Sequence, residues 1–166
     1  MNTKELEQLK EDGFCGFKTV AELRKNINIV PELTGVYVLL RPNDDEPVFL
    51  EKGTGGFFKK KNPNVAFPKL GAKWVRDTSI VYIGKADISP KTGERGLRTR
   101  LKEYLDFGQG QNIGHWGGRY VWQLKDSAEL VVCWKRVDGN AEQVEKQMII
   151  AFHEKHGKFP FANLRL

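Results

Sequence analysis

Glu145 is the residue of this chain whose position most strongly suggests chemistry. It lies in the segment 140–156, where apolar residues recur with the period of a helix. At about 100° per residue, the pattern places Glu145 between Met148, Ile149 and Phe152, on the face expected to meet the core. A carboxylate facing a core is costly to desolvate unless a cation meets it. Glu145 is therefore predicted to be either a metal ligand or the anchor of a structural ion pair.

Two further segments carry a tyrosine beside a glycine. Residues 35–37 read Gly-Val-Tyr and residues 82–84 read Tyr-Ile-Gly, each within an apolar, β-branched run typical of a buried strand. Downstream, Arg100 and Tyr104 are four residues apart on an expected helix, and Asn163 follows in the last segment. Taken alone, each residue is most simply structural, because strand tyrosines fill cores and helix-edge arginines cover apolar surface. Their joint occurrence in this order points to a shared site.

Together these features resemble the GIY-YIG nuclease family, whose paired signature matches Gly35-Val36-Tyr37 and Tyr82-Ile83-Gly84. The resemblance covers about residues 33–165. It implies an α+β domain that hydrolyses DNA phosphodiester bonds with a divalent metal cofactor, Mg²⁺ or Mn²⁺. The catalytic residues that it implies are Tyr37, Tyr82, Lys85, Arg100, Tyr104, Glu145 and Asn163.

The resemblance also implies a role for each residue, and four of these roles make physical sense for hydrolysis. Glu145 would hold one Mg²⁺, with water and phosphate completing the shell, as this ion prefers. Arg100 would present its planar fork of donors to a phosphate. Tyr37 would be the general base. Because a phenol of pKa near 10 is a poor base at neutral pH, a cation must stabilise its phenolate, and Lys85 is the expected one.

The remaining roles are positional. Tyr82 and Tyr104 would orient water or phosphate, and Asn163 would either pin the glutamate helix or contact the DNA backbone. Arg98 lies on the opposite edge of the same helical stripe as Arg100, and helical phase alone does not choose between the two arginines. The i,i+4 spacing with Tyr104 and the family register favour Arg100.

The composition is that of an ordinary soluble protein with a surplus of positive charge. The chain has 166 residues, 40% hydrophobic and 29% charged, which suits one domain with a hydrophobic core. Its net charge of +6 favours a polyanionic partner, with nucleic acid first and an acidic membrane second. No apolar run approaches the roughly 18 residues that span a bilayer, and no secretion signal is visible. Cys15 and Cys133 form neither a disulfide framework nor a zinc spacing, which predicts a cytoplasmic setting.

Other residues are weaker candidates for contact with nucleic acid. Lys59, Lys60 and Lys61 are most simply a solvated loop, with contact to the DNA backbone as the alternative. Arg98 is a further candidate. His115 lies in Gly-His-Trp-Gly-Gly, a composition typical of a tight loop near a site, with a direct catalytic role as a further alternative.

The elements that must position these residues form an α+β fold. We expect a small, mainly three-stranded antiparallel sheet flanked by helices, with strands near residues 35–40, 79–84 and 129–136, and a hairpin partner near 47–51. Helices are expected at residues 4–11, from Thr19, at 95–107 and at 140–156. Residues 1–166 are expected to form one domain, with an N-terminal helical extension over 1–30 and an insertion over 41–79.

The sequence therefore predicts a metal-dependent DNA endonuclease with an electropositive cleft. Residues 82–86, Tyr-Ile-Gly-Lys-Ala, resemble the second motif of the N-terminal incision domain of nucleotide-excision repair nucleases. The long insertion between the two tyrosine motifs resembles the restriction-enzyme branch of the family. Specificity would come from the insertion, from a partner subunit or from a homodimer. The alternative is a non-catalytic nucleic-acid-binding module on the same scaffold.

Overall fold

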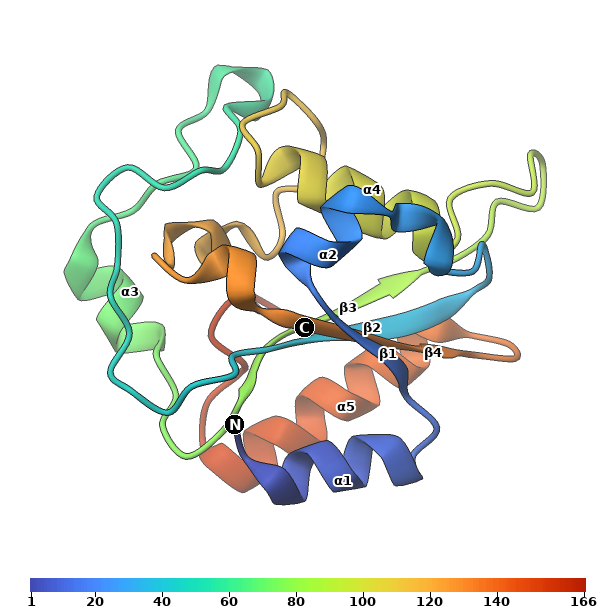
Figure 1. Ribbon diagram of the computed structural model, residues 1–166, viewed down its shortest axis with the longest axis horizontal. Helices are drawn as coiled ribbons and strands as arrows, with labels where there is room; N and C mark the ends of the chain where they lie inside the picture. Colours follow the sequence, from blue (N-terminus) through green and yellow to red (C-terminus); the bar gives the residue numbers. More distant parts are fainter.

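Strand β2 (Gly35–Leu40) is the centre of the fold in the computed structural model, which describes residues 1–166. All six of its residues are buried, because its apolar side chains are covered on both faces of the sheet. It pairs antiparallel with β3 (Ile80–Ala86) on one side and β4 (Val131–Arg136) on the other. β1 (Cys15–Thr19) pairs with β4, so the strand order is β1-β4-β2-β3 and β3 is an edge strand (Figure 1).

The predicted α+β class is confirmed, and all three expected strands are present. The sheet has four strands, however, so the predicted number of strands is wrong. The missed strand is β1, which also means that residues 1–30 are not a purely helical extension. Gly16 and Phe17 both have positive φ, and a bulge interrupts the pairing with β4 at this point. A bulge removes the alternation of apolar and polar residues by which a strand is detected in a sequence.

Helices cover both faces of the sheet (Figure 1). α1 (Thr3–Glu11) and α5 (Ala141–His156) lie on one face, and α2 (Val20–Lys25) and α4 (Leu97–Phe107) lie on the other. The expected capping box of Thr19 and Glu22 is present at the start of α2. Short 3₁₀ helices occupy Ile27–Ile29, Phe58–Lys60, Arg119–Gln123 and Ser127–Glu129. No helix combines the length and apolar character needed to cross a membrane.

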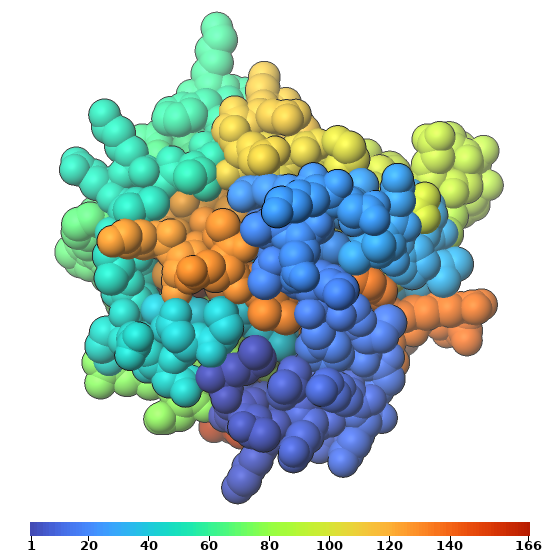
Figure 2. Space-filling view, viewed as in Figure 1, coloured from blue at the N-terminus to red at the C-terminus, as the bar shows by residue number.

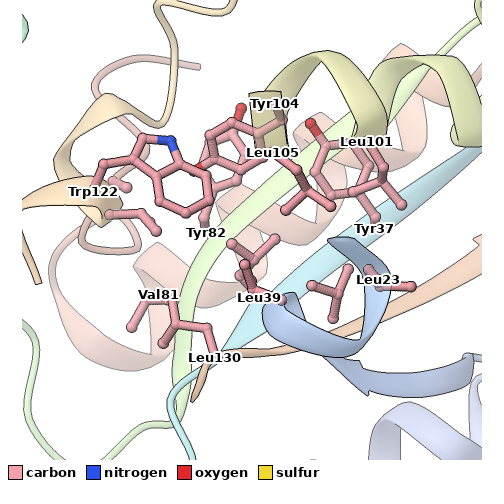
Figure 3. Packing of buried hydrophobic residues seen from close by; sticks show 14 of the residues in the cluster. Leu23, Tyr37, Leu39, Val81, Tyr82, Leu101, Tyr104, Leu105, Trp122 and Leu130 are labelled. Atoms are coloured by element: carbon pink, nitrogen blue, oxygen red, sulfur yellow. The ribbon is translucent and has the colours of Figure 1, made fainter. Parts of the chain in front are cut away.

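The register of β2 and β3 distributes the motif residues between the two faces. Tyr37 lies opposite Gly84 and Leu39 lies opposite Tyr82, so both tyrosines share the face that α4 covers (Figure 3). Lys85 is one position further along β3, and it therefore lies on the face that α5 covers.

The inserted segment, residues 41–79, packs against the 3₁₀ helix Arg119–Gln123. The Gln123 side chain bridges it, because its amide donates to the carbonyl oxygens of Leu50 and Val65 and accepts from the Val65 N–H. The predicted hairpin partner near 47–51 is wrong, since this stretch makes only an isolated bridge between Phe49 and Leu124. The segment contains one α-helix, α3 (Phe67–Lys73). Around residues 57–61 it projects at the top of the molecule (Figures 1 and 2).

Candidate active site

A cleft of about 490 Å³ lies beside the edge strand β3. Because β3 has no further neighbour in the sheet, side chains from both faces reach this edge. The cleft is lined by residues from β2, β3, α4, α5 and two loops: Tyr37, Tyr82, Lys85, Ala86, Asp87, Arg95, Arg100, Gly114 and Glu145. The structure thus brings five predicted catalytic residues together, while Tyr104 and Asn163 lie outside the lining.

Three tyrosine rings gather beneath α4 (Figure 3). The ring centroids of Tyr37 and Tyr82 are 6.1 Å apart, and those of Tyr82 and Tyr104 are 5.2 Å apart. Burial raises the pKa of Tyr82 to about 12, and it raises the pKa of Tyr37 well above its ordinary value. The Arg100 guanidinium opposes both shifts. Both phenols are therefore neutral hydrogen-bonding groups at neutral pH.

Gly84 makes room for Tyr37. A Cβ atom at this position would lie 2.4 Å from Cζ and 2.6 Å from the hydroxyl oxygen of Tyr37. The tyrosine ring therefore crosses the backbone of β3 at a point where only glycine fits, which explains the glycine of the Tyr-Ile-Gly motif.

We expect Gly84→Ala to destabilise the protein by about 1–3 kcal/mol, because the added methyl group must displace a buried ring. The corresponding loss in Tm is roughly 2–4 °C per kcal/mol for a chain of this size, measured by thermal unfolding. Gly71→Ala is the control, since a Cβ there meets nothing within 4 Å and alanine favours a helix. A Tm drop of equal size in both variants would contradict this reading.

Glu145 is half-buried on α5 and faces the cleft without an ion pair or hydrogen bond. Burial raises its pKa from 4.5 to about 7, and the ammonium of Lys85 only partly offsets this rise. The structure does not show the structural ion pair that was the alternative expectation for this residue. The unpaired carboxylate is less deeply buried than the helical pattern predicts, because it lies at the sheet edge.

Lys85 accompanies Glu145 rather than Tyr37. Its ammonium lies 2.5 Å from a carboxylate oxygen of Asp87 and 3.9 Å from one of Glu142. The expectation that Lys85 stabilises a Tyr37 phenolate is wrong in this structure, because strand alternation places the two side chains on opposite faces. The cation that acts on Tyr37 is Arg100.

Of the two candidate arginines, Arg100 lies in the cleft and Arg98 does not. Arg100 lines the cleft, where its guanidinium lies 3.0 Å from the Glu103 carboxylate. Arg98 instead donates from Nε to the carbonyl oxygen of Val30, at 2.7 Å, and does not line the cleft.

The cleft is not electropositive as predicted, because every basic side chain in it has a carboxylate partner. Lys85 pairs with Asp87, and Arg95 and Arg100 share Glu103. A phosphate therefore gains an attractive site only when a cation binds or when these ion pairs open.

His115 and Tyr104 form a layer behind the tyrosine motifs. The two rings stack with centroids 4.2 Å apart, and the Tyr104 hydroxyl donates to the carbonyl oxygen of Gly118 at 2.7 Å. His115 is 1% exposed, so its predicted contact with nucleic acid is wrong. Its Nε2 lies 3.2 Å from the Tyr37 hydroxyl and its Nδ1 lies 3.0 Å from the Gly117 carbonyl oxygen. Tyr104 supports this layer and is not placed to orient a substrate.

Asn163 closes the free edge of β3. Its side-chain oxygen accepts from the N–H of Ile83 at 2.9 Å, and its amide donates to the carbonyl oxygen of Ile83 at 2.8 Å. The side chain therefore holds the backbone between Tyr82 and Gly84. Both of its hydrogen bonds go to Ile83 and it does not line the cleft, so neither expected role, pinning the glutamate helix or contacting the DNA backbone, is seen.

The residues of the cleft fit a hydrated divalent ion better than a caged one. No group of three or more His, Cys, Asp or Glu side chains is placed to hold a metal. Mg²⁺ keeps several waters and takes one or two carboxylates together with substrate phosphates. Glu145 suits this role, because its carboxylate is half-buried and forms no ion pair.

Comparison with models of known protein families, with curated proteins and with solved structures gave no match. The case for a function of this cleft therefore rests on its own residues and geometry.

Sequence reasoning missed Asp87, Arg95 and Glu103. Asp87 and Arg95 flank the polar loop between β3 and α4, where no periodicity indicates which side chains turn inward. Glu103 could have been found, because it lies three residues after Arg100 on the same helix and such pairs meet on a helix surface.

Proposed function

We propose that this chain is a metal-dependent DNA endonuclease that hydrolyses phosphodiester bonds through a single-metal site of the GIY-YIG type. The observation that carries the proposal is the convergence of Tyr37, Tyr82, Arg100 and an unpaired Glu145 on one cleft from four different elements. Perturbed, desolvated titratable groups gathered in a cleft are typical of catalytic sites.

In this proposal the chain positions the phosphate and the attacking water. Arg100 turns from Glu103 to donate to the phosphate oxygens. Tyr37 and Tyr82 are neutral phenols that orient water and phosphate by hydrogen bonds. Glu145 holds the divalent ion. When bound, that ion supplies positive charge to the phosphate and to the departing 3′-oxygen.

The proposal is tested by incubating plasmid DNA with the protein and Mg²⁺ or Mn²⁺, with EDTA and Glu145→Ala as controls. We expect nicked or linear DNA only with the parent protein and a metal. If the parent protein binds DNA but never nicks it with any metal, the chain is a non-catalytic binding module. Against that alternative stands Glu145 itself, because an unpaired carboxylate in a binding cleft repels phosphate.

We also propose that the projecting segment around residues 57–61 contacts the DNA backbone beside the cleft. Lys59, Lys60 and Lys61 are exposed, and the first two have positive φ values of 52° and 61°. The Phe58 ring lies 3.2 Å from the position that a Cβ of Gly114 would take, and Gly114 lines the cleft. This surface is therefore continuous with the site.

Replacing these three lysines by alanine is expected to weaken binding to all DNA sequences alike. Each phosphate contact that is lost lowers the slope of log affinity against log salt by about 0.9. Lys10, Lys18 and Lys25 form a control triple with the same change in charge. The Lys10 ammonium lies over the ring of Phe17 in β1, Lys18 is in β1 at the opposite edge of the sheet, and Lys25 ends α2, which follows β1. Equal salt slopes for the two triple variants, measured by fluorescence anisotropy, would rule out this contact.

The subclass that we propose is a restriction-type enzyme. Support comes from the insertion between the two tyrosine strands, where Leu50 and Val65 are held by hydrogen bonds to the Gln123 side chain. A cytoplasmic setting remains a prediction from the sequence.

A further inference from the structure

His115 is a buried polar side chain for which the proposed mechanism so far has no use. We propose that His115 is a positioning residue that acts through Tyr37: it accepts a hydrogen bond from the Tyr37 hydroxyl and so turns the phenol oxygen toward the cleft as an acceptor for the attacking water. This inference rests on the proposed nuclease function, and it adds a residue that no motif of the sequence singles out for that role.

The tautomer of His115 follows from its partners. The carbonyl oxygen of Gly117 can only accept, so Nδ1, at 3.0 Å, must carry a hydrogen. Burial lowers the pKa of His115 to about 3, so the imidazole is neutral and Nε2 has no hydrogen. The Tyr37 hydroxyl, 3.2 Å from Nε2, must therefore be the donor.

The surroundings hold the imidazole in this orientation. His115 stacks on Tyr104 at 4.2 Å with an angle of 17° between the rings. The Tyr104 hydroxyl is bonded to the carbonyl oxygen of Gly118, whose φ of 79° is a left-handed value that favours glycine. The imidazole of His115 is thus held by a hydrogen bond at each ring nitrogen and by stacking on one ring face.

The consequence for Tyr37 is directional. A phenol has one proton, and donating it to His115 leaves only lone pairs on the side of the cleft. A water molecule there can donate to Tyr37 but cannot accept from it, so the water oxygen keeps its own lone pairs for the phosphorus atom. This orientation is what a nucleophile requires.

Tyr37 and His115 keep their protons in this role. The lowered pKa of His115 makes Nε2 an acceptor of the Tyr37 hydrogen bond and not a base that removes the proton. As the water oxygen bonds to phosphorus and the bond from phosphorus to the 3′-oxygen breaks, the proton that the water loses passes through a second water to the departing 3′-oxygen. No phenolate or imidazolium forms in the buried site, and protons balance.

The test compares His115→Phe with His115→Gln in the full chain. Phenylalanine keeps a ring to stack on Tyr104 but has no acceptor, whereas the glutamine oxygen can accept from Tyr37. We expect His115→Phe to lower kcat about 100-fold with KM changed less than about threefold, the size of loss that follows when a reacting group is misplaced. His115→Gln is expected to recover at least tenfold of that loss. A kcat for His115→Phe equal to that of the parent protein would overturn the inference.

A second measurement does not depend on activity. In ¹⁵N NMR spectra we expect His115 to show a protonated Nδ1 and a bare Nε2, and we expect Tyr37→Phe to shift the Nε2 resonance. The opposite tautomer overturns the inference even if the protein cleaves DNA. A parent protein that never cleaves DNA overturns the proposed function instead, and the role of His115 falls with it whatever the spectra show.

Discussion

Glu145→Gln is expected to make the metal-free protein more stable while abolishing metal-dependent cleavage. Above pH 7 the folded parent protein must carry an ionised carboxylate in a half-buried position without a partner. After allowance for screening by solvent, we expect glutamine to raise the free energy of unfolding by about 1–2 kcal/mol at pH 8. Tm would rise by roughly 2–4 °C per kcal/mol, measured by thermal unfolding in EDTA. Mg²⁺ should stabilise the parent protein and not the variant.

The pH dependence of this gain follows from the direction of the shift. The folded pKa of Glu145 is raised from 4.5 to about 7, so the folded protein binds the proton more tightly than the unfolded chain. Stability is therefore lost as pH rises between these two values, and the advantage of glutamine grows over the same window and vanishes below it. Glu142→Gln is the control, because Glu142 is exposed and pairs with Lys146 at 3.0 Å. Equal Tm values for parent and Glu145→Gln at pH 8 would show that the half-buried, ionised carboxylate of Glu145 does not destabilise the folded protein.

The central strands could be predicted from the sequence because burial on both faces selects a recognisable composition. β2 is a continuous apolar run, and such a run is typical of a strand that is buried on both faces. β1 could not be predicted in the same way, since its bulge at Gly16 and Phe17 breaks the alternation and its pairing partner is more than 100 residues away, at Trp134. Long-range pairing of this kind leaves no local pattern.

The candidate site was predictable only in part, for the same reason. The phase of Glu145 on its helix and the tyrosines of the two strands are local features, and the structure brings them to one cleft. The partners of these residues are not local. Lys85 and Tyr37 lie in neighbouring motifs, so the sequence suggests that the ammonium stabilises the phenol. The register of β2 and β3 instead places the two side chains on opposite faces of the sheet. His115 reaches Tyr37 across 78 residues of sequence.

Tyr104 shows how a correct position can carry a wrong role. Its helical spacing from Arg100 predicts that both side chains meet the sheet, and both do. Tyr104 lies deeper, beneath the ring of His115, where its hydroxyl is used by the backbone of Gly118. Depth below a surface depends on the loops that cover it, and spacing along one helix does not report it.

Arg100→Ala is expected to lower kcat by about 100- to 1000-fold, the loss typical of removing one donor that stabilises charge in a transition state. The variant removes the group that can grip the phosphate, and it also removes the charge that lowers the pKa values of Tyr37 and Tyr82. Both phenols then become still harder to ionise. Arg100→Lys should recover only part of the loss, because an ammonium cannot match two phosphate oxygens at once. Single-turnover nicking with saturating protein measures these rates.

Arg98→Ala is the matched control for Arg100→Ala, because it removes the same side chain from the same helix. Arg98 is bonded to the Val30 carbonyl and lies outside the cleft, so its loss should lower Tm and leave kcat within about threefold of the parent value. Arg100 has only Glu103 as a partner within α4, and Arg95 keeps that carboxylate paired in its absence, so Arg100→Ala should change Tm little. The two variants therefore separate a loss of rate from a loss of stability. If both lowered kcat and Tm together, Arg100 would serve the integrity of α4 and not the phosphate.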